Sequence, residues 1–377
     1  MTKSLSPAQQ RLLLQTPDDD LLSTFKGFSR SWLRREKAAL LKTVSPKDLM
    51  SLDLERSKSK AQLRASEAQY KAAMSEAEDL KAALDTVLRL QDNFKMGTLK
   101  IKSAPNTHEA TAIALASDWH SEEPVNPNQV NGLNAFDLRI FEERAKAFFS
   151  NLITLVRKEQ QAIKINNLVL WLGGDFITGS IHDDTTFQNQ LGPVDALINV
   201  QQVIGNGINT LLEALPDIKL TIPCSVGNHS RMTKKQMIKS EQENSLEALM
   251  YRSLAQLFEG RATFIVPQGY HTYLDIHGFV VRFHHGHNIQ YQGGIGGITV
   301  PVNKAISGWN RSRTAYLDCF GHFHQRFDGG NFLANGSLIG YSEYALAIKA
   351  AYEPPQQQFA LIDSVHGKTV VAPILLT

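Results

Sequence analysis

The sequence predicts an α/β fold for residues 105–377, preceded by an all-helical extension. From Glu109 onward, short β-rich runs alternate with helical patterns and with turns rich in Gly, Pro and Asn, the order typical of an α/β domain. No glycine lies between Gly27 and Gly97, which favours a long helix there. A hydrophobic fraction of 42% and a charged fraction of 20% over 377 residues exclude a disordered or collagen-like chain.

The extension divides into a small helical segment, residues 1–50, and a long helix or coiled-coil stalk, residues 51–100. Two short helices are expected in the first segment, the second of them around Trp32 and Leu33. The basic residues of that second helix are Arg30, Arg34, Arg35 and Lys37. Such a pair of helices fits either a helix-turn-helix that binds nucleic acid or a solvated surface face.

Apolar residues of the long helix recur at alternating steps of three and four residues, the spacing of a coiled-coil seam. The seam consists of Leu63, Tyr70, Ala73, Ala77, Leu80, Leu84 and Val87. Two interpretations remain open: a homodimer through residues 53–94, or one amphipathic helix that lies against the main domain.

In the main domain, strands are expected where β-branched and aromatic residues form short apolar runs. These runs are Thr111–Ser117, Leu168–Leu172, Leu220–Val226, Phe279–His285, Tyr316–Phe320 and Phe359–Ile362. The intervening helices are expected at Phe136–Lys158 and Val194–Leu215.

Residues of metal-ligating type follow five of these strands, at the point where each strand ends. They are Asp118 and His120, then Asp175, then Asn228 beside His229, then His285, and finally His322 and His324. Because strand ends meet along one rim of a sheet, these side chains are expected to converge. Oxygen ligands mixed with imidazoles suit Mn²⁺, Fe or Zn²⁺ better than Ca²⁺, and the set is large enough for two divalent ions in a hydrolytic site.

The ordered series D-x-H, GGD, GNH, HGH and GHFH, within about residues 110–340, resembles the motifs of the calcineurin-like metallophosphoesterase superfamily. The resemblance implies a two-sheet β sandwich flanked by helices, with the site on strand-end loops and two metal ions, manganese being the first expectation. The overall arrangement of the chain also looks like that of the bacteriophage-encoded members of this superfamily. The resemblance implies that Asp118, His120 and His324 bind one ion and that Asn228, His285 and His322 bind the other. It implies that Asp175 bridges both ions. It also implies that His229 protonates the leaving oxygen or stabilises the transition state.

Two departures from the family pattern affect residues next to the ligands. The second motif commonly continues GDxxDR, but Thr178 and Gly179 replace the acid and the arginine here. Ser230 follows His229 where the family often has a carboxylate, so His229 loses a group that would orient it. Arg231 comes next and is either a candidate phosphate clamp or a surface arginine.

Residues 290–313 separate the fourth motif from the fifth. Their paired glycines predict a flexible loop over the site, in which Lys304, Arg311 and Arg313 are candidate contacts to a polyanionic substrate. The alternative is a structural loop that needs tight turns.

Together these observations predict a two-metal phosphoester hydrolase, in particular a phosphodiesterase or nuclease that acts on DNA through a metal-bridging hydroxide. The alternatives are a phosphatase or small-molecule phosphodiesterase for a nucleotide or phosphoprotein, and a non-catalytic binding or scaffold protein. The net charge is only +2, but residues 1–100 carry 18 Lys and Arg against 13 Asp and Glu. This local excess permits a nucleic-acid partner without requiring one.

The two cysteines, Cys224 and Cys319, lie far apart in short apolar runs, which is typical of a reducing compartment. The first 20 residues contain only the apolar stretch Leu12–Leu14, so no signal peptide is expected. No run approaches the roughly 20 apolar residues of a spanning helix. The expectation is a cytoplasmic protein without a membrane partner, or one of the host cytoplasm if a phage encodes it.

Overall fold

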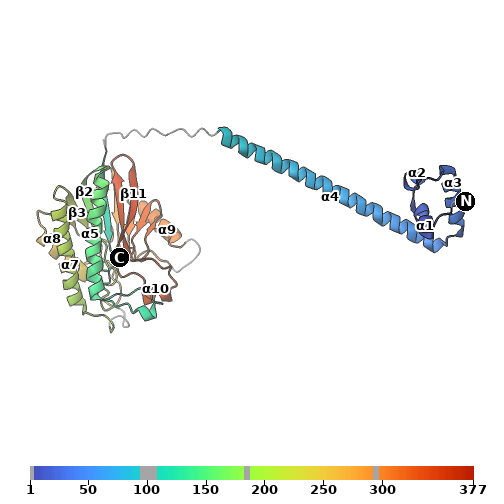
Figure 1. The fold of residues 1–377 in the computed structure, drawn as a ribbon. Helices are drawn as coiled ribbons and strands as arrows, with labels where there is room; N and C mark the ends of the chain where they lie inside the picture. The colour runs from blue at the N-terminus through green and yellow to red at the C-terminus, as the bar shows by residue number, and fades with distance from the viewer. Residues whose placement is uncertain (1–3, 94–107, 182–186, 292–296) are drawn as a thin grey trace. The chain divides into compact units, whose positions relative to one another are not determined.

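The computed structural model describes residues 4–93, 108–181, 187–291 and 297–377. The chain divides into two compact units, residues 1–102 and 103–377. Figure 1 shows the first unit as helices and the second as a mixture of strands and helices.

In the first unit, serine caps mark the starts of three of the helices, through Ser6, Ser29 and Ser45. The Ser6 hydroxyl accepts the backbone N–H of Gln9 while the Gln9 side chain accepts the N–H of Ser6, and Ser29 caps its helix in the same way through Trp32. The helices are α1 (Pro7–Gln15), α2 (Leu21–Thr24), α3 (Arg30–Thr43) and α4 (Pro46–Asn93). Their small core consists of Leu5, Leu13, Leu21, Phe25 and Leu33. The sequence predicted α2 and α3 but missed α1.

Acids ahead of α2 pair with three of the four basic residues noted on α3. The Lys37 ammonium lies 3.0 Å from the Asp18 carboxylate and the Arg34 guanidinium 3.4 Å from it, and Arg30 lies 3.6 Å from Asp19. These exposed pairs add little stability, yet they neutralise much of the positive face. The arrangement favours the solvated-face interpretation over a nucleic-acid reader.

Helix α4 exposes every one of its described side chains. The seam residues Leu63, Tyr70, Leu80 and Leu84 have exposed fractions between 57% and 69%. The described seam residues are therefore uncovered within the first unit, and the side chain of the seam residue Val87 lies outside the described residues. Residues 94–100 of the predicted stalk lie outside the described residues.

The first sheet of the second unit has the strand order β11-β10-β1-β2-β3-β4. Strands β1 to β4 pair in parallel, whereas β10 pairs antiparallel with both β1 and β11. The bounds are β1 (Glu109–Ala116), β2 (Lys164–Leu172), β3 (Lys219–Pro223), β4 (Thr263–Ile265), β10 (Gln356–Asp363) and β11 (Gly367–Leu375).

The second sheet has the order β5-β6-β7-β9-β8, in which β6, β7 and β9 run parallel. Its strands are β5 (Thr272–Ile276), β6 (Phe279–Phe283), β7 (Leu317–Phe320), β8 (Phe327–Asp328) and β9 (Phe332–Ala334). The strands predicted from sequence agree with these to within a few residues.

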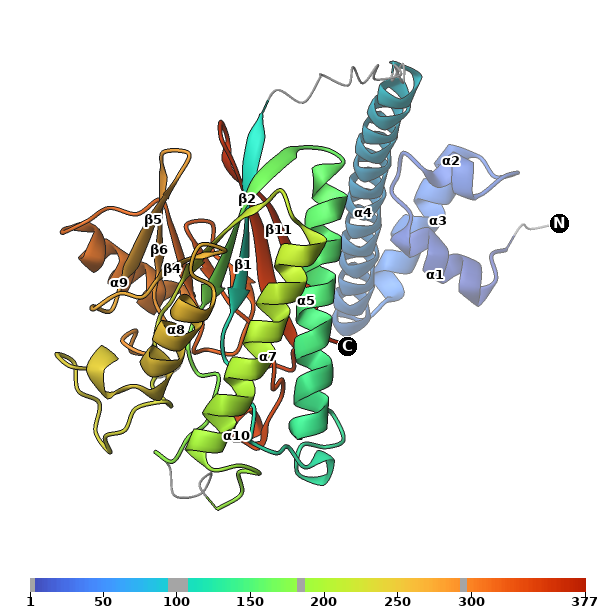
Figure 2. The same cartoon turned by 90° about the vertical axis from the view of Figure 1, so that its left-hand side faces the viewer.

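The two sheets pack face to face, and helices cover their outer faces. Ile113 and Trp171 from the first sheet meet Phe283 and Leu317 from the second in a buried cluster between them. Helices cover the outer face of the first sheet through a larger cluster (Figure 2). These helices are α5 (Leu138–Gln160), α7 (Pro193–Ala214) and α8 (Leu246–Leu257).

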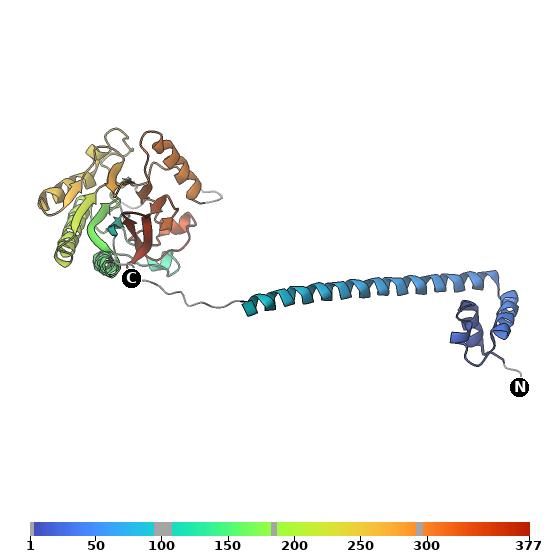
Figure 3. The ribbon, with the colours of Figure 1, turned by 90° about the horizontal axis from the view of Figure 1, so that it is seen from above.

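Helix α9 (Thr299–Asn310) covers the second sheet, with Val302 and Ile306 packed against Phe320 and Phe332. Figure 3 shows α9, in orange, on the side of the sheets away from the green and yellow α7 and α8. The second unit is therefore a two-sheet sandwich flanked by helices, as the family resemblance implied. Its shorter helices are η1 (Pro127–Gln129), η2 (Gln242–Asn244) and α10 (Glu343–Ala347).

The prediction of a flexible loop over residues 290–313 is wrong for half of that range. Residues 299–310 form α9, because Val302 and Ile306 lie one turn apart and give the segment an apolar face. Residues 292–296 lie outside the described residues. Nowhere in the described parts of the chain is a helix both long and apolar enough to cross a membrane.

Candidate metal centre

The carboxyl ends of five parallel strands, three from one sheet and two from the other, bring the predicted ligands together. Asp118, Asp175 and Asn228 follow the neighbouring strands β1, β2 and β3. His285 follows β6 in the second sheet, and His322 and His324 follow its neighbour β7. Since the sheets pack face to face, their strand ends form one shared rim.

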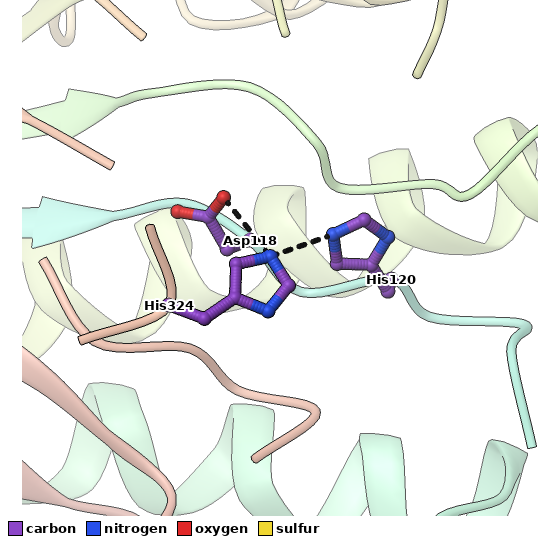
Figure 4. A group of neighbouring side chains, drawn as sticks. All are labelled: Asp118, His120 and His324. Atoms are coloured by element: carbon purple, nitrogen blue, oxygen red, sulfur yellow. Dashed lines mark hydrogen bonds and ion pairs between the residues drawn. The ribbon is translucent and has the colours of Figure 1, made fainter. Parts of the chain in front are cut away.

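The first group of ligand-type side chains consists of Asp118, His120 and His324, whose ligand atoms lie within 4.8 Å of one another (Figure 4). His324 Nε2 is 3.5 Å from Asp118 Oδ1 and 3.2 Å from His120 Nε2. Two imidazole nitrogens and one carboxylate oxygen thus point at a common position, which is the donor set of a divalent transition metal.

The second group consists of Asp175, His285 and His322, also within 4.8 Å of one another. His285 Nε2 lies 2.9 Å from Asp175 Oδ2. Asp175 also groups with His120 and His229, so its carboxylate lies between the two sets. Asn228 Oδ1 is buried without a hydrogen-bond partner among the described residues. A buried acceptor of this kind is costly unless a ligand satisfies it, so Asn228 fits a bound cation.

Five of the seven predicted ligands have a left-handed backbone. Their φ values are 57° for Asp118, 47° for His120, 53° for Asp175, 69° for His322 and 54° for His324. In the described chain only three further non-glycine residues have positive φ: Asn131, His277 and Lys349. Residues with side chains rarely adopt this region, and such strain concentrates at functional sites.

Glycines next to the ligands allow the loops to approach one another closely. A Cβ on Gly227 would lie 2.0 Å from Asp175 Oδ1, and one on Gly321 would lie 2.2 Å from Asp118 Oδ2. A larger residue at either position would displace a candidate ligand. The glycines of the GNH and GHFH motifs are therefore required by packing against the carboxylates of other strands.

Hydrogen bonds from the far side of two rings fix the histidine tautomers. His285 Nδ1 lies 2.7 Å from the Gly173 carbonyl, which can only accept, so Nδ1 carries the proton and Nε2 faces Asp175. The Thr178 hydroxyl donates to Glu123 at 2.8 Å and so accepts from His120 Nδ1 at 2.9 Å. Both rings present Nε2 to the centre, as metal-ligating histidines do.

Burial and neighbouring charges set the ionisation of the centre. Burial lowers the pKa of His120 and His322 well below the usual range, and that of His324 to about 4, so these rings are neutral and offer lone pairs. Burial also raises the pKa of Asp118 to about 7.

Asp175 and His285 form a charged pair in the absence of a cation. Burial would lower the pKa of His285, but Asp175 raises it to about 10. Burial would raise the pKa of Asp175, but His285 and His229 hold it well below its usual range. A divalent cation that takes the place of this proton releases it on binding.

A buried glutamate that the sequence analysis missed joins the second and third motif loops. Glu247 of α8 accepts the backbone N–H of Phe176 at 2.8 Å, the N–H of Gly227 at 2.9 Å and the Ser230 hydroxyl at 2.9 Å. Its side chain is fully buried, and burial raises its pKa to about 7. Glu247 thus holds the loop of the second motif and the loop of the third motif together.

Glu122 holds the loop of the second motif through hydrogen bonds of the same kind. It accepts the backbone N–H groups of Thr178 and Gly179 at 2.9 and 2.8 Å, and burial raises its pKa to about 7. In the sequence, the only feature that could have pointed to Glu122 is its position two residues after His120. Neither glutamate belongs to a recognisable sequence motif, because each accepts hydrogen bonds from backbone N–H groups, which almost any residue type can supply.

His229 lies beside the first group of ligands. Its Nδ1 lies 3.1 Å from the Thr178 carbonyl, and its backbone N–H donates to Asp175 Oδ1 at 2.9 Å. Its ring centroid is 4.8 Å from that of His120. The Thr178 carbonyl thus orients this histidine.

The three candidate substrate-binding arginines occupy different surroundings. The Arg231 guanidinium donates to the backbone carbonyls of Asn228, Thr233 and Lys234. The Arg313 guanidinium lies 4.1 Å from the centroid of the Tyr273 ring. Arg311 is exposed directly after α9. A role for any of them in substrate binding stays a prediction.

No family model matches this chain, and no curated protein matches it. The hypothetical protein PH1004 from Pyrococcus horikoshii OT3 is a similar solved structure, at 12% identity over 70% of this chain and 88% of that chain, with a TM-score of 0.35. Vps29 from Chaetomium thermophilum is 11% identical over 70% of this chain and 94% of its own, with a TM-score of 0.25. TM-scores below 0.5 do not establish a shared fold, so the site stands on the chain's own residues.

Proposed function

We propose that the second unit is a two-metal phosphoester hydrolase of the calcineurin-like kind, a phosphodiesterase whose substrate class is DNA. The observation that carries this proposal is the convergence of the predicted ligands from five strand ends, with the Asp175 carboxylate between two ligand groups. A structural metal site needs only one such group.

Asp118, His120 and His324 would hold one ion, and His285, His322 and Asn228 the other, with Asp175 shared. Bound ions of this kind supply electrostatic stabilisation of a phosphoryl oxygen and activation of water as the nucleophile. The chain itself keeps the donors in place through the strained loops and through Glu122 and Glu247, so little reorganisation accompanies binding.

His229 is the residue proposed to deliver a proton to the leaving oxygen. The contact from Nδ1 to the Thr178 carbonyl holds the ring in one orientation, beside His120 and Asp175. A general acid must lie within hydrogen-bond reach of the atom that it protonates, and the grouping of His229 with His120 and Asp175 meets that condition for a phosphate bound between them.

The experiment that tests the proposal is hydrolysis by the Mn²⁺-loaded full chain of bis(p-nitrophenyl) phosphate, p-nitrophenyl phosphate, and single- and double-stranded DNA. Asp175→Asn is the inactivating variant, and Asp217→Asn, at an exposed turn before β3, is the matched control. We expect cleavage of DNA and of the small diester that Asp175→Asn abolishes and the control retains.

Monoester turnover without DNA cleavage would replace the nuclease by a phosphatase. Tight Mn²⁺ binding without turnover of any of these substrates would refute hydrolysis and favour a scaffold.

We also propose that α4 joins two copies of the chain, because its apolar seam is exposed along the described helix. Analytical ultracentrifugation of the full chain should then show a dimer that Leu80→Asp dissociates. Ala68→Asp, placed off the seam, should leave the dimer intact. A monomeric wild-type chain at micromolar concentration would refute the proposal.

A further inference from the structure

The segment that follows His229 is strongly basic and exposed. Between Ser230 and Ser240 it contains Arg231 and three lysines but no acid. The lysines are Lys234, Lys235 and Lys239, and all three are exposed. Within the described ranges of the chain, none of them forms an ion pair with a carboxylate. We call residues 231–239 the basic loop.

Hydrogen bonds hold the backbone of the basic loop in a defined shape. The Arg231 side chain binds the carbonyls at three positions of the loop and its base, and the Thr233 hydroxyl donates to the Lys235 carbonyl at 2.7 Å. The Met232 N–H donates to the Asn244 carbonyl at 2.8 Å. Arg231 thus shapes the loop, and the lysine side chains remain available to a ligand.

The loop is fastened to the metal centre on the side of the second ligand group. Gln236 donates to Asn288 at 3.2 Å and to Glu241 at 3.1 Å, and Glu241 pairs with His287 at 2.8 Å. The His287 ring centroid is 5.4 Å from that of the candidate ligand His285. A ligand bound by the lysines therefore lies next to the proposed reaction site.

We propose that the basic loop binds the phosphate backbone of a nucleic-acid strand and guides it to the metal centre. This inference rests on the proposed function, because the centre then reacts with a phosphodiester of the strand that the lysines hold. Clustered ammonium groups bind polyanions by releasing condensed counterions.

The loop also exposes apolar side chains, with exposed fractions of 61% for Met232 and 83% for Ile238. They offer contact surface to unstacked bases. An anionic membrane surface has a similar charge and apolar character, but its phosphates are not presented as a strand that can enter the metal centre. A nucleic acid is therefore the occupant that fits both the loop and the site beside it.

The test is fluorescence anisotropy of labelled single- and double-stranded 20-nucleotide DNA with the full chain, in EDTA to prevent cleavage, over a range of salt concentrations. The variant is the triple substitution Lys234→Ala, Lys235→Ala and Lys239→Ala. The matched control is Lys158→Ala, Lys164→Ala and Lys219→Ala, which removes the same charge. These control lysines are exposed, at the end of α5 and the starts of β2 and β3, away from the ligand-bearing strand ends.

We expect the loop variant to weaken DNA binding about 10- to 100-fold at 0.1 M salt, and to reduce the slope of log K against log salt by about 2 to 3. The ratio of DNA cleavage to bis(p-nitrophenyl) phosphate turnover should fall at least about 10-fold. Equal DNA affinity of the loop variant and the control would overturn the proposal. So would loop-dependent binding to phosphatidylserine vesicles with no DNA binding.

The two proposals fail in different ways. If the wild-type chain binds DNA but hydrolyses no phosphoester, and only the loop variant loses DNA binding, the basic-loop proposal holds and the hydrolase proposal fails. If the chain cleaves the small diester but the loop variant binds and cleaves DNA as the control does, the hydrolase proposal holds and the basic-loop proposal fails.

Discussion

Glu247→Gln tests whether a buried glutamate of α8 holds two metal-binding loops together. The wild-type carboxylate accepts the N–H of Phe176 with one oxygen, and the N–H of Gly227 and the Ser230 hydroxyl with the other. A glutamine has only one acceptor oxygen, so in either orientation one backbone donor faces an amide NH₂. The substitution keeps the shape of the side chain and removes one acceptor.

The size of the effect follows from that lost acceptor. One buried donor without a partner costs about 1–3 kcal/mol. A kilocalorie per mole shifts the unfolding temperature of a domain of this size class by about 2–4 °C, so the variant should unfold about 2–12 °C below the wild type. Glu247→Ala orphans all three donors and leaves a cavity, and it should cost about 3–5 kcal/mol.

The same loops position the candidate ligands, because Phe176 follows Asp175 and Gly227 precedes Asn228. Isothermal titration of Mn²⁺ should therefore show about 10- to 100-fold weaker binding to the folded Glu247→Gln variant. Glu259→Gln, on an exposed residue just after α8, is the matched control and should match the wild type in both measurements. A Glu247→Gln protein with wild-type unfolding temperature and Mn²⁺ affinity would refute the positioning role.

Two further substitutions test packing at the centre and beside it. Gly227→Ala should abolish Mn²⁺ binding in a titration, since its Cβ would fall 2.0 Å from Asp175 Oδ1, whereas Gly308→Ala in α9 meets no atom within 4 Å and should bind normally. Asp318→Asn leaves the buried Arg282 guanidinium, 2.6 Å away, without a countercharge and should cost about 3–5 kcal/mol at pH 7 in urea unfolding. Burial would raise the pKa of Asp318, but His284 and Arg282 lower it. The stabilisation that Asp318 provides is therefore present above about pH 4 and is lost as the pH falls through its folded-state pKa. The stability difference between variant and wild type should shrink as the pH falls through that pKa, and a constant difference would contradict this reasoning.

Much of the centre could be predicted from local features of the chain. Asp118, Asn228 and His322 each follow a short apolar run, and residues after such runs lie at strand ends. The structure brings together six of the seven predicted ligands with His229, and it buries the side-chain oxygen of the seventh, Asn228. The order of the motifs carried this information, because each motif combines an apolar strand, a glycine and a ligand within a few residues.

Helix α9 was predicted as a loop because the paired glycines just before it dominated the local signal. Pro301 is tolerated because it lies in the first turn of the helix, where its missing N–H has no partner to lose. The apolar face formed by Val302 and Ile306 becomes decisive only when Phe320 and Phe332 are present to cover it. Packing therefore overrode propensity in this segment.

The sequence alone determined which residues end the five ligand-bearing strands and which of them have metal-ligating side chains, since strand periodicity, turns and motif spacing are local properties. The tertiary structure decided that Asp175 lies between two ligand groups, and that Glu122 and Glu247 accept hydrogen bonds from the loops that carry the motifs. It also decided that Arg231 turns to backbone carbonyls while Lys234 and its neighbours face outward. These outcomes depend on burial and on hydrogen-bond partners contributed by distant segments, and a donor or acceptor has no fixed partner until the chain has packed.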